Sequence, residues 1–307
     1  MTTTMPRDFI GYADHAPHPR WPGDARIAIN FALNIEEGAE YSPLDGDPLT
    51  DTALTEGVGM DTGIRGRDLS AESMYEYGSR VGVWRLMRLF GERNMPVTAF
   101  ACAQALERNP PLVRALRAAG HDICCHGWRW EKPWLLDEAT EADHISRAQE
   151  SIERLLGEKI TGWCSRYGPG MNTRRLVAQA GIPYDSDSSN DELPYWTRVE
   201  GRPHLVVPYS LVTNDCKLVP GGLPSSDDFF MLLRDAFDQL YEEGADAPRM
   251  MTVGVHPRMA GHPGRARGLA RFLDHVLAHE RVWVCRRVEI ARHWIAHFPP
   301  DGSEVAA

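Results

Sequence analysis

Short apolar runs alternate with amphipathic stretches along most of the chain. Runs of strand length occupy residues 27–33, 96–102, 121–125, 160–166, 204–209, 250–255 and 282–285. Between them, apolar residues recur at the spacing of a helix face in the regions 83–90, 112–119, 145–155, 172–181, 229–240 and 269–277. Because strands and helices alternate, we expect a mostly parallel sheet with helices packed outside it.

About seven parallel strands joined by right-handed crossovers form either a closed barrel or an open, wound sheet. The periodicity alone does not distinguish these two folds. In both of them the active site lies at the carboxyl ends of the strands. Candidate functional residues are therefore expected directly after each apolar run.

The composition narrows the functional classes. The chain has 307 residues, with 33 Lys and Arg against 43 Asp and Glu, so its formal net charge is −10. Such acidity argues against nucleic acid or an anionic membrane as a partner. No apolar run approaches the ~20 residues of a membrane span, and residues 1–22 lack the apolar core of a signal peptide. We expect a cytoplasmic protein whose six cysteines, none in a CxxC pair, are free thiols.

Polar residues follow several of the predicted strands. They comprise two glutamates, two histidines, an arginine and an aspartate: Glu36, Glu37, His126, Arg166, Asp215 and His256. Each alone is better explained as a loop charge, a buried core histidine or a turn residue. Because equivalent positions in successive βα units meet at one end of the sheet, we expect the six to converge on an active site.

The order of these segments resembles the polysaccharide deacetylase family. That family has Asp-Asp-Gly after its first strand, His-x3-His after a later strand, and then arginine, aspartate and Leu-His-Pro motifs. The corresponding positions here are Glu36-Glu37-Gly38, His126, Arg166 with Pro169-Gly170, Asp215 and Val255-His256-Pro257. The resemblance implies an α/β fold, a distorted seven-stranded (β/α) barrel over residues 26–300, with an N-terminal extension at 1–25 and a tail at 301–307.

Two departures from the family pattern bear on metal binding. The longer Glu37 replaces an aspartate ligand, and Trp130, which cannot ligate a metal, replaces the second histidine of His-x3-His. A catalytic zinc site usually has three protein ligands, and only Glu37 and His126 remain in register. The sequence therefore favours a member without a cofactor. A divalent metal such as zinc at a rearranged site, with His256 and His262, is the alternative.

The same replacement indicates a subgroup. The chain resembles the metal-independent allantoinases and cyclic imide hydrolases of this family, in stretches that include residues 6–12, 21–28, 34–38, 75–80, 126–130, 184–187 and 191–196. The resemblance implies hydrolysis of a non-peptide C–N bond in a small cyclic amide or ureide, such as allantoin opening to allantoate. It also implies a homo-oligomer, either a tetramer or a dimer. A metal-dependent carbohydrate N-deacetylase and a catalytically silent ligand-binding module remain alternatives.

The residue types suggest a mechanism for ring opening. Glu36 or Glu37 would act as a general base on water, and a neighbouring carboxylate would raise its pKa toward neutrality. His126 or His256 would protonate the leaving nitrogen. Which glutamate and which histidine take these roles is left open by the sequence.

Further residues are expected to stabilise charge and bind the ring. Arg166, held by Asp215, would stabilise the developing oxyanion. Four aromatic side chains and one acidic side chain near the mouth are candidates to bind the substrate: Trp128, Trp130, Tyr195, Trp196 and Asp187.

Overall fold

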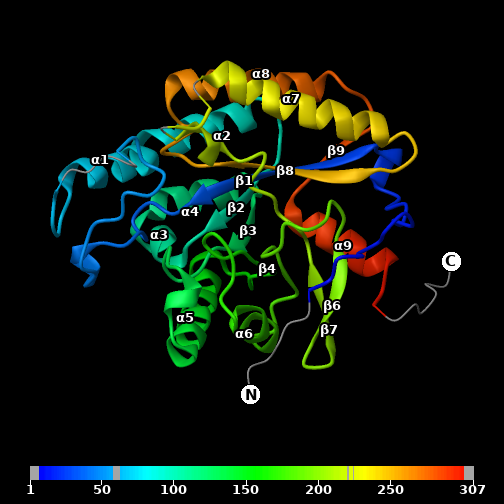
Figure 1. Ribbon diagram of the computed structural model, residues 1–307. Helices are drawn as coiled ribbons and strands as arrows, with labels where there is room; N and C mark the ends of the chain where they lie inside the picture. Colours follow the sequence, from blue (N-terminus) through cyan, green and yellow to red (C-terminus); the bar gives the residue numbers. More distant parts are fainter. Residues whose placement is uncertain (1–6, 58–62, 220, 224, 301–307) are drawn as a thin grey trace.

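The fold is built around one curled sheet, shown in Figure 1. The computed structural model describes residues 7–57, 63–219, 221–223 and 225–300. Within these residues the sheet has nine strands, in the order β6-β7-β5-β4-β3-β2-β1-β8, with β9 also paired to β1. The strands are β1 (Ile27–Ile35), β2 (Thr98–Ala101), β3 (Asp122–Cys125), β4 (Gly162–Trp163), β5 (Tyr184–Asp185), β6 (Tyr195–Val199), β7 (Arg202–Val206), β8 (Arg249–Val255) and β9 (Val282–Val284).

β1 lies inside the sheet and all nine of its residues are buried, as its nearly continuous apolar sequence predicts for a parallel strand covered on both faces. It pairs in parallel with β8 along most of its length, with β9 near its start and with β2 near its end. The register aligns Ile35 with Ala101 and Leu33 with Val255. The residues that follow β1, β2 and β8 therefore emerge at the same edge of the sheet.

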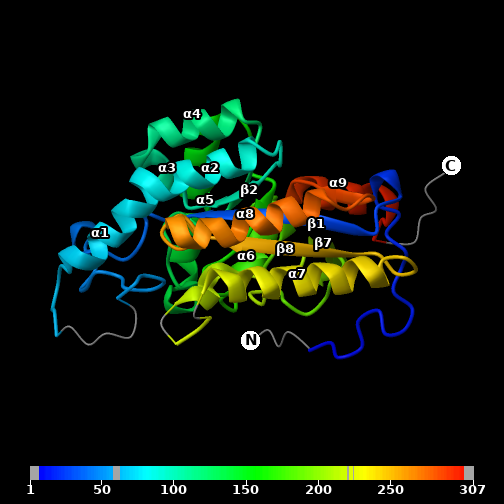
Figure 2. The same cartoon turned by 90° about the horizontal axis from the view of Figure 1, so that it is seen from above.

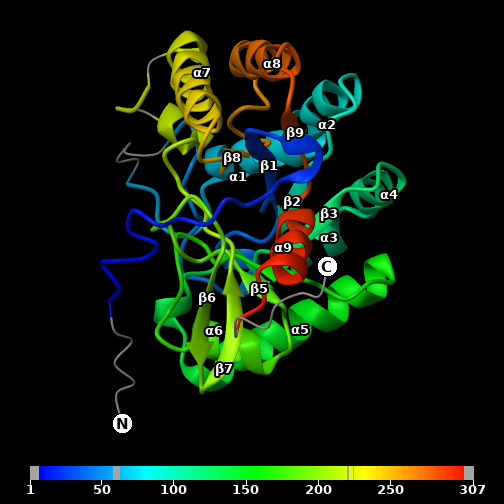
Figure 3. The same cartoon turned by 90° about the vertical axis from the view of Figure 1, so that its right-hand side faces the viewer.

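Helices pack around the outside of the sheet, as the end view in Figure 3 shows. The described helices are α1 (Leu69–Tyr77), α2 (Val83–Gly91), α3 (Ala103–Arg108), α4 (Pro110–Ala118), α5 (Glu138–Leu156), α6 (Thr173–Gln179), α7 (Ser226–Glu243), α8 (Pro263–Leu277) and α9 (Arg287–His297). A π-helical turn at Gly78–Gly82 joins α1 to α2. Short 3₁₀ turns cover Pro22–Asp24, Pro43–Asp45, Pro133–Leu135 and Asp215–Leu218. Figures 1 and 2 show α7 and α8 side by side on one flank, next to β8.

The predicted (β/α) barrel fold is confirmed, although the strand count differs from seven. All seven predicted strands are present, and β5 and β6 are additional. β5 has only two residues, which is too short to give a recognisable pattern. β6 is only partly buried and forms an antiparallel hairpin with β7, which breaks the parallel order at this edge.

The N-terminal extension is described from residue 7 onward. The described part of the N-terminal extension is fastened at two points: the Tyr12 hydroxyl donates to Pro194 O, and the Trp21 indole donates to Arg249 O. The predicted tail at 301–307 lies outside the described residues. No helix in the described part of the chain is long and apolar enough to cross a membrane. All six cysteines are free, as the sequence predicts.

Candidate active site

A cavity of about 220 Å³ opens at the end of the sheet where the site residues were predicted. Most of its wall is formed by residues that follow β1, β3, β4, β5, β7 and β8. The predicted residues that line it are Glu36, His126, Trp130, Asp187 and His256. Asn214 and Tyr209, which were not predicted, also contribute to the wall.

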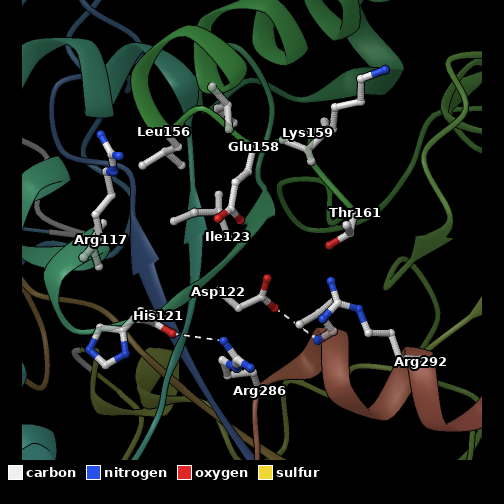
Figure 4. Close-up of a pocket in the computed structure, with 15 residues that line it drawn as sticks. Arg117, His121, Asp122, Ile123, Leu156, Glu158, Lys159, Thr161, Arg286 and Arg292 are labelled. Carbon is white, nitrogen blue, oxygen red and sulfur yellow. Dashed lines mark hydrogen bonds between the residues drawn. The ribbon is translucent and has the colours of Figure 1, made fainter.

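A larger hollow, of about 490 Å³, lies at the other end of the strands (Figure 4). Its wall includes Asp122 and Ile123 at the start of β3, Leu156 at the end of α5, Arg286 just before α9 and Arg292 within α9. None of the predicted site residues is among those that line it. The smaller cavity is therefore the candidate active site.

Glu36 is the centre of the polar cluster in the cavity wall. It follows the last residue of β1, and only 1% of its side chain is exposed. Its Oε1 lies 3.3 Å from His126 Nε2 and 3.4 Å from His256 Nε2. These three side chains come from the ends of β1, β3 and β8, as the strand-end argument predicts. Glu37, the next residue, points away from the cavity and is not part of its wall.

A buried arginine, Arg258, joins the two glutamates. Its Nη2 donates to Glu36 Oε2 at 2.6 Å and its Nη1 to Glu37 Oε1 at 3.2 Å. Its Nε donates to Leu54 O at 3.1 Å, and its guanidinium lies 4.6 Å from the ring centre of Tyr75. Because a buried carboxylate needs a partner of opposite charge, Arg258 stabilises the ionised form of Glu36.

The two glutamates titrate differently. Burial opposes the ionisation of Glu36, but Arg258 and His256 outweigh it and hold the pKa of Glu36 well below its usual range. Burial raises the pKa of Glu37, and the nearby charge of Glu36 raises it further. Glu36 is therefore ionised at neutral pH, while Glu37 is the carboxyl group of the pair that more readily holds a proton.

His256 forms a hydrogen-bonded pair with Asp215. Its Nδ1 donates to Asp215 Oδ1 at 2.6 Å, and the other oxygen, Oδ2, accepts from the backbone N–H groups of His256 and Ala260. Burial alone would lower the pKa of His256, but Glu36 and Asp215 raise it to about 9. At neutral pH the ring is an imidazolium with a proton on Nε2, facing Glu36.

His126 has the opposite proton arrangement. Its Nδ1 is 2.6 Å from Cys164 O, a carbonyl that can only accept, so Nδ1 carries a hydrogen. Its Nε2 accepts from the Trp130 indole N–H at 3.2 Å. An indole N–H can only donate, so Nε2 is unprotonated. Because His126 Nε2 accepts from Trp130, we assign the Nε2 proton that faces Glu36 to His256.

The candidate metal ligands Glu37 and His126 do not fit a bound cation. Glu37 already faces the positive charge of Arg258, and the lone pair of His126 Nε2 is occupied by the Trp130 indole. Trp130, which stands where the family has the second histidine of His-x3-His, is buried. The Arg258 guanidinium lies 4.9 Å from the centre of the Trp130 ring. The structure therefore places a guanidinium and an indole N–H against the groups that would otherwise coordinate a metal.

Arg166 stands behind the cavity wall. Its Nη1 donates to Asp51 Oδ2 at 2.6 Å and to Trp130 O at 2.7 Å, and its guanidinium lies 3.5 Å from the Trp130 ring centre. The expected pairing of Arg166 with Asp215 is wrong. Arg166 forms its ion pair with Asp51, from a distant loop, and Asp215 is hydrogen-bonded to His256. Arg166 is not among the cavity residues, so its contacts position Trp130.

Asp187 occupies the wall after β5. Both of its oxygens accept from Ser165, one from the backbone N–H at 2.6 Å and one from the hydroxyl at 2.7 Å. Burial, together with the nearby charge of Asp185, raises the pKa of Asp187. A carboxyl group with a raised pKa in a small cavity is suited to hydrogen bonding with polar groups of a bound ring.

Three of the predicted ring-binding aromatics lie outside the cavity. Trp128 turns toward α5, where the guanidinium of Arg147 lies 4.3 Å from its ring centre. Tyr195 and Trp196 belong to the β6 hairpin and line an outer groove with the N-terminal extension. The Trp196 indole donates to Phe298 O at 2.6 Å. The expectation that these three side chains line the cavity is therefore wrong.

Arg258 is the main residue that the sequence argument missed. It stands two residues after His256 at the end of β8, so the strand-end rule could have included it. Nothing in the local pattern indicates that its side chain turns back under the cavity to meet Glu36 and Glu37. That contact joins residues more than 200 positions apart.

Comparison with known proteins agrees with this architecture. The polysaccharide deacetylase family model matches residues 66–184. A Schizosaccharomyces pombe protein classed with the polysaccharide deacetylases is 40% identical over 299 residues, covering 91% of this chain and 93% of that protein. A crystal structure of a probable polysaccharide deacetylase from Pseudomonas aeruginosa PAO1 has a TM-score of 0.91 at 48% identity, covering 96% of this chain and 99% of that one.

The crystal structure of PuuE allantoinase is also similar, with a TM-score of 0.92 at 48% identity, covering 97% of this chain and 99% of that one. The similarities to these two crystal structures extend over nearly the whole chain. On the strength of this sequence and structural similarity, the chain belongs to the polysaccharide deacetylase family, a family of hydrolases.

Proposed function

We propose that this protein hydrolyses a C–N bond in a small cyclic amide or ureide, with allantoin as the leading candidate. The observation that carries the proposal is the charge arrangement at the cavity: an ionised Glu36 beside a protonated His256, with Arg258 where a metal would otherwise balance the carboxylates. Such a site has a proton acceptor and a proton donor and does not depend on a cofactor. The similarity to PuuE allantoinase at 48% identity supports the choice of a ring substrate.

Ring opening then needs two proton transfers. Glu36 Oε1 takes a proton from water as the water oxygen adds to the ring carbonyl. The ring C–N bond breaks as the His256 imidazolium gives its Nε2 proton to the leaving nitrogen. The products are a carboxylic acid and a free amide or amine nitrogen, so the atoms of water are accounted for.

The site resets itself through the contact between its two groups. After ring opening Glu36 holds a proton and His256 has lost one, and their atoms Oε1 and Nε2 lie 3.4 Å apart. The pKa of Glu36 is lowered and that of His256 is raised to about 9, so the proton moves downhill from the carboxyl group to the imidazole. A pair of groups with pKa values pushed apart in this way is typical of an acid and base that work together.

The size and lining of the cavity favour a single ring. A volume of about 220 Å³ is below the usual ~300 Å³ lower bound of small-molecule pockets, so a glycan chain would have to remain largely outside. Asp187, Ser165 and Asn214 offer polar groups to the ring carbonyls and N–H groups. Trp130 supplies an aromatic wall whose orientation is held by Arg166.

The second candidate is a carbohydrate N-deacetylase, favoured by the Schizosaccharomyces pombe relative at 40% identity. The two functions separate in one assay panel containing allantoin, hydantoin, succinimide and N-acetylglucosamine oligomers, each with and without chelator. We expect ring opening that chelator leaves unchanged. Deacetylation of the sugars that requires added zinc would support the alternative instead, and no turnover of any compound would indicate a ligand-binding module.

Variants assign the activity to this site. We expect Glu36→Gln and His256→Asn each to lower kcat by about 100-fold or more, the usual size of a general acid–base contribution. Glu92→Gln, which changes an exposed glutamate after α2, is the matched control and should retain the wild-type rate. Circular dichroism of all three variants checks that they are folded. Wild-type rates in both site variants would reject the proposed mechanism.

A further inference from the structure

Three side chains between α7 and α8 form a cluster that the proposed reaction does not use. Asp238 belongs to α7, His275 to α8, and His279 lies one turn further along, just after α8 ends. One ligand atom from each lies within 4.8 Å of the other two, and all three side chains are half-buried. Among the described residues, this is the one group of three or more His, Cys, Asp or Glu with such spacing.

The hydrogen bonds within the cluster leave a histidine nitrogen available. His279 Nδ1 donates to the carbonyl of His275 at 2.8 Å, so the lone pair of its ring is on Nε2. Metal-binding histidines commonly donate their second ring nitrogen to a backbone carbonyl in this way, because the bond fixes the tautomer and the ring orientation. On the other side of the cluster, Asp238 Oδ1 lies 2.6 Å from His275 Nε2.

Aromatic residues of α7 hold the rings in place. The ring of Phe237 lies edge to face with His275 at 5.7 Å and with His279 at 5.1 Å. The ring of Tyr241 also lies edge to face with His279, with 5.0 Å between the ring centres. The polar cluster therefore has an apolar wall on the α7 side, which limits the number of orientations that the two imidazoles can adopt.

We propose that Asp238, His275 and His279 bind one zinc ion, with water as the fourth ligand. Zinc takes imidazole nitrogen and carboxylate oxygen in tetrahedral geometry, and three protein ligands plus water form a common zinc arrangement. Binding replaces the hydrogen bond between Asp238 and His275 with two bonds to the metal. Because its ligands come from both helices, the ion ties α7 to α8 on the flank seen in Figures 1 and 2.

This site is separate from the catalytic cavity, and the distinction matters for interpreting metal content. None of the three ligands lines the cavity around Glu36. One bound zinc ion, together with an activity that chelator does not change, would therefore be consistent with the site at α7 and α8. Stoichiometric zinc alone is not evidence for a metal-dependent reaction.

The chain provides a matched control in a second histidine pair. His293 and His297 of α9 have the same four-residue spacing, and His297 Nδ1 donates to the carbonyl of His293 at 2.9 Å. His293 Nε2, however, lies 2.8 Å from Pro19 O, and no ion pair joins either ring to a carboxylate within the described residues. The two pairs thus differ in the carboxylate that completes the proposed site.

The test is calorimetric titration of the chelator-treated full-length protein with zinc chloride. We expect one site in the wild type, affinity weakened by about tenfold or more in His279→Ala and Asp238→Ala, and no change in His297→Ala. Zinc should raise the Tm of the wild type and of His297→Ala but not of His279→Ala, because only a bound ligand stabilises the folded state. Absence of a binding site in the wild type, or unchanged affinity in His279→Ala, would overturn the proposal.

Discussion

The guanidinium of Arg258 lies fully buried against Glu36, with Nη2 2.6 Å from the carboxylate Oε2. The same guanidinium also reaches Glu37, so one arginine is the counter-charge for two adjacent glutamates. In the family pattern these positions hold a catalytic base and a metal ligand. The chain therefore carries its own fixed cation beside Glu36, contributed by the residues that follow β8.

Removal of this cation should destabilise the protein strongly. Arg258→Met leaves Glu36 and Glu37 buried without a partner, and losing one member of a buried ion pair costs about 3–5 kcal/mol. We expect a loss of this size in the free energy of unfolding, measured by urea denaturation at pH 7.

A triple variant distinguishes lost charge balance from lost packing. Arg258→Met combined with Glu36→Gln and Glu37→Gln removes all three charges and keeps similar volumes, so most of the stability should return. If the triple variant is no more stable than Arg258→Met, packing around the guanidinium matters more than its charge. Wild-type stability in the single variant would contradict the assignment.

Restoring the missing histidine should not create a metal site by itself. Trp130→His rebuilds the His-x3-His spacing with His126, but Arg258 still occupies the space between the carboxylates. We expect zinc to bind at this centre in Trp130→His combined with Arg258→Ala and not in Trp130→His alone. The measurement is zinc titration in a His279→Ala background, which removes the proposed site at α7 and α8.

Thermal denaturation of both variants provides the control for folding. The wild-type chain in the same His279→Ala background gives the baseline for adventitious zinc. Tight binding by Trp130→His alone would mean that Arg258 moves aside and is not the element that excludes the ion.

The sequence predicted seven of the nine described strands and brought Glu36, His126 and His256 together because both depend on local order. β1, β3 and β8 are marked by apolar runs, and parallel strands bring their carboxyl ends together. Glu36, His126 and His256 each stand within a residue or two of such an end, so their convergence follows from the fold.

The pattern of apolar and polar residues does not predict the orientation of individual side chains. Trp128 and Trp130 stand two residues apart after β3, yet Trp130 turns inward to His126 while Trp128 turns out to Arg147. Arg258 and Asp51 were missed because their partners are far away in the chain. Only long-range packing determines such contacts, and no spacing rule reports them.

Gly78 should be intolerant of a side chain. Gly78 lies in the π-helical turn between α1 and α2, directly against the side chain of Glu37. A Cβ at this position would clash with the Glu37 carboxyl group. We expect Gly78→Ala to displace Glu37 and cost about 1–3 kcal/mol of stability, as other overpacked cores do. Gly91→Ala, at the end of α2 where a Cβ meets nothing within 4 Å, is the matched control and should be neutral or slightly stabilising. Equal urea midpoints for the two variants would contradict the steric argument.

Activity should persist far into the alkaline range and then fall with the deprotonation of His256. The pKa of His256 is raised to about 9, so the imidazolium that acts as the acid is present below that pH and is lost above it. The pKa of Glu36 is held well below its usual range, so the acidic limb of the profile should lie below the normal glutamate region near 4.3. The measurement is the pH dependence of kcat for ring opening.

Asp215→Asn tests whether the alkaline limb belongs to His256. The Asp215 carboxylate accepts a hydrogen bond from His256 Nδ1 and raises the pKa of that ring. Removing the negative charge of Asp215 should therefore move the alkaline limb from about 9 toward the usual histidine value near 6.5. Glu36 remains in place, so the shift should stop short of that value. Asp187→Asn, which changes a cavity carboxyl group without a contact to His256, should leave the limb where it is. An unmoved limb in Asp215→Asn would assign the alkaline titration to a different group and remove His256 from the role of acid.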